Sequence, residues 1–153
     1  MKNRKKIIIV AHCLLTKGFS NQHRDNMNDI LKVLLDSETG IIQLPCPFLI
    51  PLPTGKQYGK NYTENDNRLF TSLSQQELSR LYSNSLSPFI MQLEAYLKQN
   101  FEIAGLVGIK NSQNCEVETS YNKAAENRGI FMKILKQELK KRAIRTNMVN
   151  IEF

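Results

Sequence analysis

The sequence contains no tryptophan and no stretch approaching the roughly 20 consecutive apolar residues that a membrane-spanning helix needs. It carries no recognition-helix or RNA-binding signature, which argues against a nucleic-acid partner although the net charge is +7. Internal repeats and low-complexity tracts are also missing. What remains is a chain of 153 residues, 41% of them hydrophobic, which predicts a single domain over residues 1–153.

Cysteine is scarce: the chain has three, all far apart, and no Cys-x-x-Cys pair. The basic and apolar N-terminus resembles a secretory leader, but its apolar run is short and His12 interrupts it. Histidine is also not the small residue expected before a cleaved cysteine. We therefore expect a cytoplasmic protein with no membrane partner. There, an odd number of separated cysteines indicates metal binding or catalysis rather than a disulfide framework.

Apolar patterns with strand and helix periods alternate along the chain. Predicted strands cover residues 6–11, 40–44, 103–109 and 148–153. Predicted helices cover residues 24–36 and 128–142, with another that begins after Ser74. This alternation predicts an α/β fold, a single Rossmann-like three-layer domain with a small, mostly parallel sheet. Because no glycine-rich phosphate loop follows the first strand, a nucleotide-binding module is disfavoured.

Three local features refine this prediction. Ser74 and Glu77 form a capping box at the start of the middle helix. Pro88 is expected to interrupt that helix or to restart it at its first turn. Residues 46–72 are rich in proline and glycine, and we expect them to form a long loop that covers a pocket.

Each cysteine follows a predicted strand: Cys13 the first, Cys46 the second and Cys115 the third. The carboxyl ends of parallel strands share one edge, where ligands bind in such folds, so we expect the three sulfurs to surround one pocket. Four interpretations stay open: three unrelated buried thiols, a zinc site with His12 or His23 as fourth ligand, a thiol nucleophile, or an iron–sulfur cluster.

Three segments resemble motifs of the 2-thiouracil desulfurase (TudS-like) family. They are residues 11–15 (Ala-His-Cys-Leu-Leu), 43–47 (Gln-Leu-Pro-Cys-Pro) and 108–115 (Gly-Ile-Lys-Asn-Ser-Gln-Asn-Cys). Residues 129–131, at the head of the last helix, resemble the family too. The resemblance implies a [4Fe-4S] cluster on Cys13, Cys46 and Cys115, with one open iron that captures the sulfur of a small thiolated substrate. The implied activity is that of a desulfidase.

The resemblance also assigns helper residues. Ser112 matches a family position that acts near the open iron, and Phe48 stands where the family usually has a glutamate. Lys110 could neutralise an anionic cluster or substrate, and Tyr58 could stack on a planar ring. Because Phe48 replaces a carboxylate, a non-catalytic redox or metal sensor is the alternative function. The oligomeric state stays open, a homodimer being one option.

Overall fold

The computed structural model describes residues 4–16, 27–35, 38–50, 73–119 and 128–152, and in these ranges four strands form one sheet. The strands are β1 (Lys5–Val10), β2 (Gly40–Gln43), β3 (Phe101–Ile109) and β4 (Met148–Ile151). Their spatial order is β2-β1-β3-β4, and every neighbouring pair is parallel. The predicted Rossmann-like α/β class is therefore confirmed.

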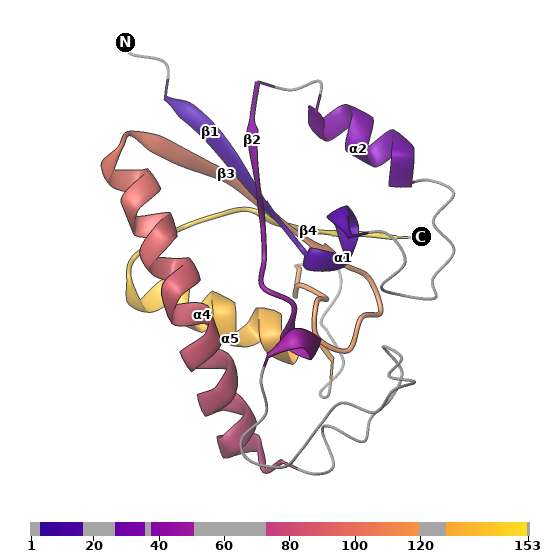
Figure 1. Ribbon diagram of the computed structural model, residues 1–153, viewed down its shortest axis with the longest axis vertical. Coiled ribbons are helices and arrows are strands. Elements are labelled where there is room, and N and C mark those ends of the chain that lie inside the picture. Colours follow the sequence, from indigo (N-terminus) through magenta and orange to yellow (C-terminus); the bar gives the residue numbers. More distant parts are fainter. Residues whose placement is uncertain (1–3, 17–26, 36–37, 51–72, 120–127, 153) are drawn as a thin grey trace.

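Helices cover both faces of this sheet (Figure 1). They are α2 (Met27–Leu35), α4 (Gln75–Lys98) and α5 (Ile130–Lys141). Helices α4 and α5 lie on one side of the strands, whereas α2 lies on the other. The chain passes from β1 outward to β2 and then back past β1 to β3. Because the crossovers between parallel strands are right-handed, the connection from β1 to β2 covers one face of the sheet, and the connections to β3 and β4 cover the other face.

The central strands β1 and β3 have near-continuous apolar sequences because helices cover both of their faces. Ile9, Val10 and Leu106 are fully buried, and Val107 nearly so. Burial of each such side chain contributes about 1.5–3 kcal/mol. These side chains hold the ends of β1 and β3 in place, and the cysteine-bearing segments begin at those ends.

The predicted capping box at the start of α4 is confirmed. The Ser74 Oγ accepts a hydrogen bond from the Glu77 backbone N–H at 3.2 Å, and the Glu77 Oε2 accepts one from the Ser74 N–H at 2.7 Å. Two backbone donors that a helix start leaves free are thereby satisfied. Neither α4 nor any other helix of the described part of the chain is long and apolar enough to cross a bilayer.

The expectation that Pro88 interrupts or restarts the helix is wrong, because α4 runs through Pro88 as one helix of 24 residues. A proline inside a helix lacks the backbone N–H and costs about 3 kcal/mol. Here Leu86, Phe89 and Ile90 flank the proline and are all buried in the core. Their burial together outweighs that cost, so packing overrides the local preference.

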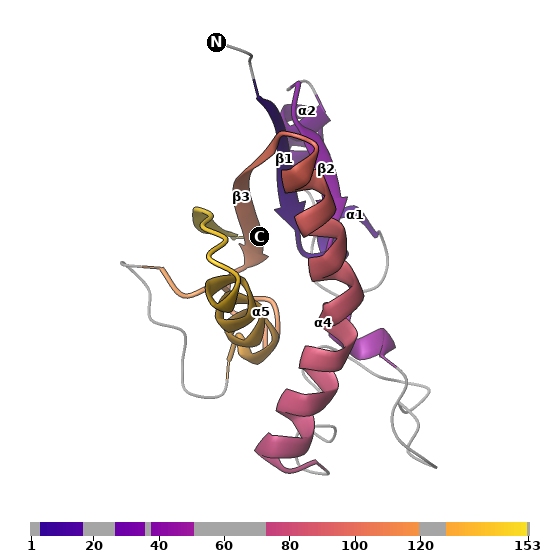
Figure 2. The same cartoon turned by 90° about the vertical axis from the view of Figure 1, so that its left-hand side faces the viewer.

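Helix α5 packs against α4, and Figure 2 shows the two side by side. The rings of Tyr82 and Phe131 meet edge to face with their centroids 5.2 Å apart. Both side chains are fully buried, so this contact anchors α5 to α4.

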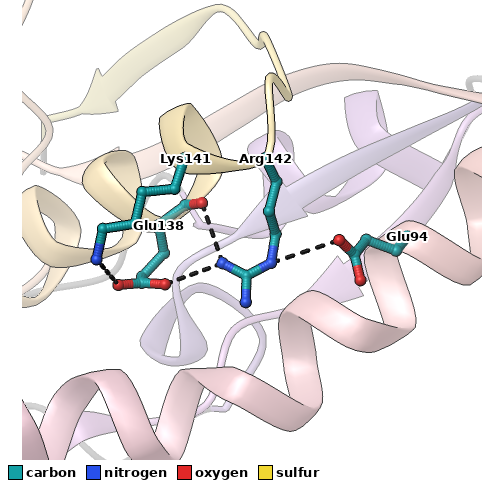
Figure 3. Close-up of polar contacts among 4 residues, drawn as sticks. All are labelled: Glu94, Glu138, Lys141 and Arg142. Carbon is teal, nitrogen blue, oxygen red and sulfur yellow. Dashed lines mark hydrogen bonds and ion pairs between the residues drawn. The ribbon is translucent and has the colours of Figure 1, made fainter.

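An ion-pair group at the end of α5 supplements this contact (Figure 3). The Arg142 Nη1 lies 2.9 Å from Glu138 Oε2, and the Arg142 Nε lies 3.4 Å from Glu94 Oε1 on α4. Hydrogen bonds from Lys141 and Arg142 lower the pKa of Glu138, so it stays ionised at neutral pH. Pairs this exposed contribute only about 0–1 kcal/mol each, so the apolar contact dominates.

Not every apolar residue of the helices faces the core. In α2, Leu34 packs against the core, but its neighbour Leu35 is 70% exposed. In α4, Leu97 is partly exposed near the end of the helix. Successive residues of a helix point about 100° apart, so a stripe that includes neighbouring residues exceeds the arc that one sheet face can cover.

Candidate functional site

The three cysteines all lie at the carboxyl edge of the sheet. Cys13 lies in α1 (His12–Leu15), directly after β1; Cys46 precedes the short 3₁₀ turn η1 (Pro47–Leu49) after β2; and Cys115 follows β3. Each is at most 5% exposed and none forms a disulfide. The chain reverses its direction across the sheet between β1 and β3, so Cys13 and Cys115 flank the switch point where ligands bind in this class of fold.

After β1 the chain forms the short helix α1, of which His12 and Cys13 are the first two residues. Ala11 donates its backbone N–H to the Val107 carbonyl at 2.9 Å, and the chain then turns into α1. Burial lowers the pKa of His12, which favours the neutral imidazole.

Cys13 affects the pKa of Cys46. A hydrogen bond from the Cys13 thiol is the main cause that lowers the pKa of the Cys46 thiol. Hydrogen bonds from the backbone amides of Phe48 and Leu49 lower this pKa further. Burial and the charge of Cys115 raise it, but the lowering causes outweigh them. The Cys46 sulfur thus lies in surroundings that favour a thiolate, the form that binds soft metals.

Hydrogen bonds within its own segment hold the backbone of Cys115 in place. Its backbone N–H donates to the Ser112 Oγ at 3.0 Å, and its carbonyl accepts from the Ile109 N–H at 2.8 Å. Ser112 is 1% exposed, so this hydrogen bond is shielded from water. The observed contact of Ser112 therefore sets the orientation of the Cys115 backbone.

Gly108 permits this arrangement because the loop returns across it. A Cβ at Gly108 would lie 2.4 Å from the Cys115 carbonyl oxygen and 2.9 Å from Asn150 Oδ1. The Asn150 side chain itself accepts from the Val117 N–H and donates to the Val117 carbonyl, both at 2.8 Å. Strand β3, the loop that bears Cys115 and strand β4 therefore come so close at Gly108 that only glycine fits there.

Gly108→Ala tests that close approach. The added methyl must displace the Cys115 backbone, so we expect a loss of about 1–3 kcal/mol in the free energy of unfolding. Urea titration followed by circular dichroism measures this loss. The matched control is Gly105→Ala on the same strand, where the new Cβ would meet its nearest neighbour at 3.7 Å. Equal losses in the two variants would contradict the role given to Gly108.

Asn114 carries a buried amide that lacks a full set of partners. Its Oδ1 accepts from the Tyr82 hydroxyl at 3.0 Å, and its carbonyl accepts from the Met132 N–H at 3.2 Å. Its Nδ2 is buried and finds no acceptor among the described residues. An unpaired buried donor costs about 1–3 kcal/mol, and a bound group with acceptor atoms would remove that cost. Asn114 directly precedes Cys115, so this donor belongs to the cysteine edge.

The same loop holds a buried ion pair that the sequence did not reveal. The Glu116 Oε2 lies 2.9 Å from the Arg128 Nε, and the Glu116 side chain is fully buried. Gly129, next to Arg128, adopts a left-handed backbone with φ of 67° and donates its N–H to the Gln113 carbonyl at 2.8 Å. The pair and this bond attach the Cys115 loop to the start of α5. An acidic residue after a strand is the weak signal that could have found Glu116.

The remaining predicted site residues are placed as follows. Phe48 is 4% exposed and lies in η1, next to Cys46. The Lys110 Nζ forms an ion pair with Glu152 Oε2 at 2.9 Å and lines a hollow of about 680 Å³ beside β4. Tyr58 and most of the predicted covering loop lie outside the described residues. Phe48 is therefore buried two residues after Cys46, whereas Lys110 pairs with Glu152 after β4.

The described residues include no group of three histidine, cysteine or acidic side chains set to hold one metal ion. Around a single tetrahedral zinc, sulfurs 2.3 Å from the metal would lie only about 3.8 Å apart. A cubic cluster imposes a wider spacing, because each thiolate binds a different iron. The three buried thiols at this edge are of the ligand type that such a cluster uses.

The fold and this edge define a Rossmann-like α/β protein with three buried thiols at its switch point. The chain is 33% identical over 141 residues to the uncharacterized protein MJ0003 of Methanocaldococcus jannaschii, a match that covers 90% of this chain and 80% of that protein. It belongs to the family of that protein. No family model matches the chain, and no solved structure matches it.

Proposed function

We propose that this protein is an iron–sulfur desulfidase that removes sulfur from a small thiolated compound resembling a thio-nucleobase. In this proposal Cys13, Cys46 and Cys115 hold a [4Fe-4S] cluster. The observation that carries it is the placement of every cysteine of the chain, buried, at one sheet edge around the switch point. The resemblance of the three cysteine motifs to the 2-thiouracil desulfurase family supports the same assignment.

When bound, a cluster held by three thiolates supplies one iron without a protein ligand, a Lewis acid suited to a soft sulfur atom. The chain's own groups support that site. A hydrogen bond from Cys13 lowers the pKa of Cys46 and so favours its thiolate, and Ser112 holds the Cys115 backbone in place. The Asn114 amide offers a hydrogen bond to a sulfur or to a substrate heteroatom. Burial of all three sulfurs keeps water away from the site.

One observation favours a second function, a cluster-binding redox or metal sensor. Phe48 stands where the resembled family usually has a glutamate, and it is buried two residues after Cys46. An apolar ring transfers no proton, so the helper expected for desulfuration is missing at this position. A sensor needs the three thiolates and needs no such helper.

Anaerobic purification and reconstitution separate these functions from a metal-free protein. We expect about four iron and four sulfide ions per chain, and release of sulfide from at least one compound in a panel of thiolated bases. A chain that binds iron and sulfide but releases no sulfide would leave the sensor as the function. A chain that binds neither, under conditions that load a known cluster protein, would exclude both.

Phe48→Glu restores the missing carboxylate and probes its role directly. If proton transfer limits the reaction, sulfide release from 2-thiouracil should rise by about 10²–10⁴-fold, the usual contribution of a general acid or base. Sulfide is measured colorimetrically on equally loaded samples. Phe48→Leu is the control, because it opens similar space without a carboxylate. A rise in both variants would show that space, and not proton transfer, limits turnover.

A further inference from the structure

A hollow of about 570 Å³ lies at the amino edge of the sheet, the edge opposite the cysteines. Strand β3 begins before its pairing with β4, which starts at Leu106 and Met148. Among the described residues, positions 101–105 therefore have no strand neighbour on that side. The register of β3 against β1 also slips by one residue at Ala104, which lines the hollow. The space is large enough for a small ligand.

Three arginines from different parts of the chain line this hollow. Arg4 precedes β1, Arg142 follows α5, and Arg145 precedes β4. Glu102 is the acidic residue among the lining residues, so three positive charges less one negative charge leave a net charge of +2. Arg4 and Arg145 are exposed, and within the described part of the chain neither guanidinium forms an ion pair or a hydrogen bond. Their charges are therefore free to act on a ligand.

Arg142 is held in place by two carboxylates (Figure 3). Its Nη1 lies 2.9 Å from Glu138 Oε2, and its Nε lies 3.4 Å from Glu94 Oε1. Its remaining nitrogen, Nη2, contacts none of the other residues drawn in Figure 3. A guanidinium has five N–H donors, two of them on this nitrogen. Arg142 thus offers a pair of donors whose orientation is fixed before a ligand arrives.

The ends of α4 and α5 lie at the same edge, and the carbonyl groups at a helix end attract cations. Arg142 fits this structural role, because its Nη1 donates to the Glu138 carbonyl at 3.3 Å. Arg4 and Arg145 lie outside the helices, and their guanidiniums donate to no carbonyl of the described ranges. The helix ends therefore leave two of the three positive charges without an explanation.

We propose that this hollow binds a small phosphate monoester, whose phosphate group contacts the three arginines. A phosphate dianion balances the net charge of +2 and offers three oxygens to the guanidiniums, whereas a carboxylate supplies one charge and two oxygens. Leu97, Ile103 and Ile144 also line the hollow and give the organic group of the ester an apolar wall. This site lies outside the cysteine edge and does not rest on the proposed desulfidase activity.

Isothermal titration calorimetry of the full-length protein with phenyl phosphate tests the proposal. At about pH 8 the probe is a dianion, and an ionic strength of about 0.1 M suppresses distant charge effects. We expect phenyl phosphate to bind at a single site, inorganic phosphate to bind more weakly because it lacks the apolar contact, and phenol not to bind. Dissociation constants of phenyl phosphate above about 1 mM would overturn the proposal. Equal affinities for phenyl phosphate and either of the other two compounds would overturn the assignment of a phosphate monoester.

Single variants locate the site. Arg4→Gln and Arg145→Gln each remove a charged donor, so we expect the affinity for phenyl phosphate to fall about tenfold or more. The matched control is Arg80→Gln, an exposed position about 25 Å from Leu97 along α4, which should keep its affinity within about twofold. Circular dichroism checks that each variant is folded.

Two results would exclude the hollow as the binding site. Equal losses in Arg4→Gln, Arg145→Gln and Arg80→Gln would show that net charge, and not a local site, attracts the probe. Unchanged affinity in both Arg4→Gln and Arg145→Gln would place the probe elsewhere on the protein. Since no cysteine and no iron take part in this binding, neither result bears on the proposed desulfidase.

Discussion

Replacement of Cys13, Cys46 or Cys115 by serine, one at a time, is expected to abolish the bound cluster. A hydroxyl is a hard and weakly acidic ligand, so it cannot replace a soft thiolate on iron. After anaerobic reconstitution we expect iron to fall from about four per chain to a small residue, with loss of the cluster's visible absorbance. Iron and sulfide assays together with absorption spectra measure this change.

The fold should survive these substitutions. Each sulfur is buried, so the introduced hydroxyl costs about 1–3 kcal/mol at most. Ser112→Ala is the matched control, because Ser112 lies in the Cys115 loop, is equally buried and offers no soft ligand. We expect Ser112→Ala to retain the cluster, and lower sulfide release would then reflect positioning or proton relay. Retention of full iron by any one cysteine variant would remove that cysteine from the ligand set.

The second large effect is on stability. Arg128→Leu removes the cation that lies 2.9 Å from the fully buried Glu116 carboxylate. Removing the cation from a buried ion pair costs about 3–5 kcal/mol, a large part of the stability of a domain this size. We therefore expect a drop of that size in the free energy of unfolding. Urea denaturation followed by circular dichroism measures it.

Two comparisons isolate the cause. The double variant Glu116→Leu with Arg128→Leu removes both charges and should recover most of the loss, because the penalty comes from the buried charge that has lost this cation. Lys141→Leu removes a cation that is 2.8 Å from Glu138 on the surface, and it should cost less than about 1 kcal/mol. If the double variant is no more stable than Arg128→Leu alone, packing and not charge explains the effect.

The local signals in the sequence predicted the elements well. Strand and helix periods identified β1, β2, β3, β4 and α5, and the capping box placed the start of α4. These signals act between residues at most four positions apart, so the chain displays them directly. The alternation of strand and helix was sufficient for the α/β class because parallel strands require crossover connections.

Only the tertiary structure decided the remaining features. Helix α4 continues through Pro88 because buried neighbours outweigh a local penalty, and the sequence alone gives no measure of that burial. The bond between Tyr82 and Asn114 joins residues 32 positions apart, and the pair of Glu116 with Arg128 depends on how α5 docks. Such partners are chosen by packing.

The placement of the cysteines also depends partly on the sequence and partly on the tertiary structure. The sequence by itself determined that each cysteine follows a strand, and parallel pairing then places all three at one edge. The strand order β2-β1-β3-β4 decided that Cys13 and Cys46 follow adjacent strands, while Cys115 follows the strand on the other side of β1. That order arises from long-range packing of helices on the two faces of the sheet, which no local pattern of residues encodes.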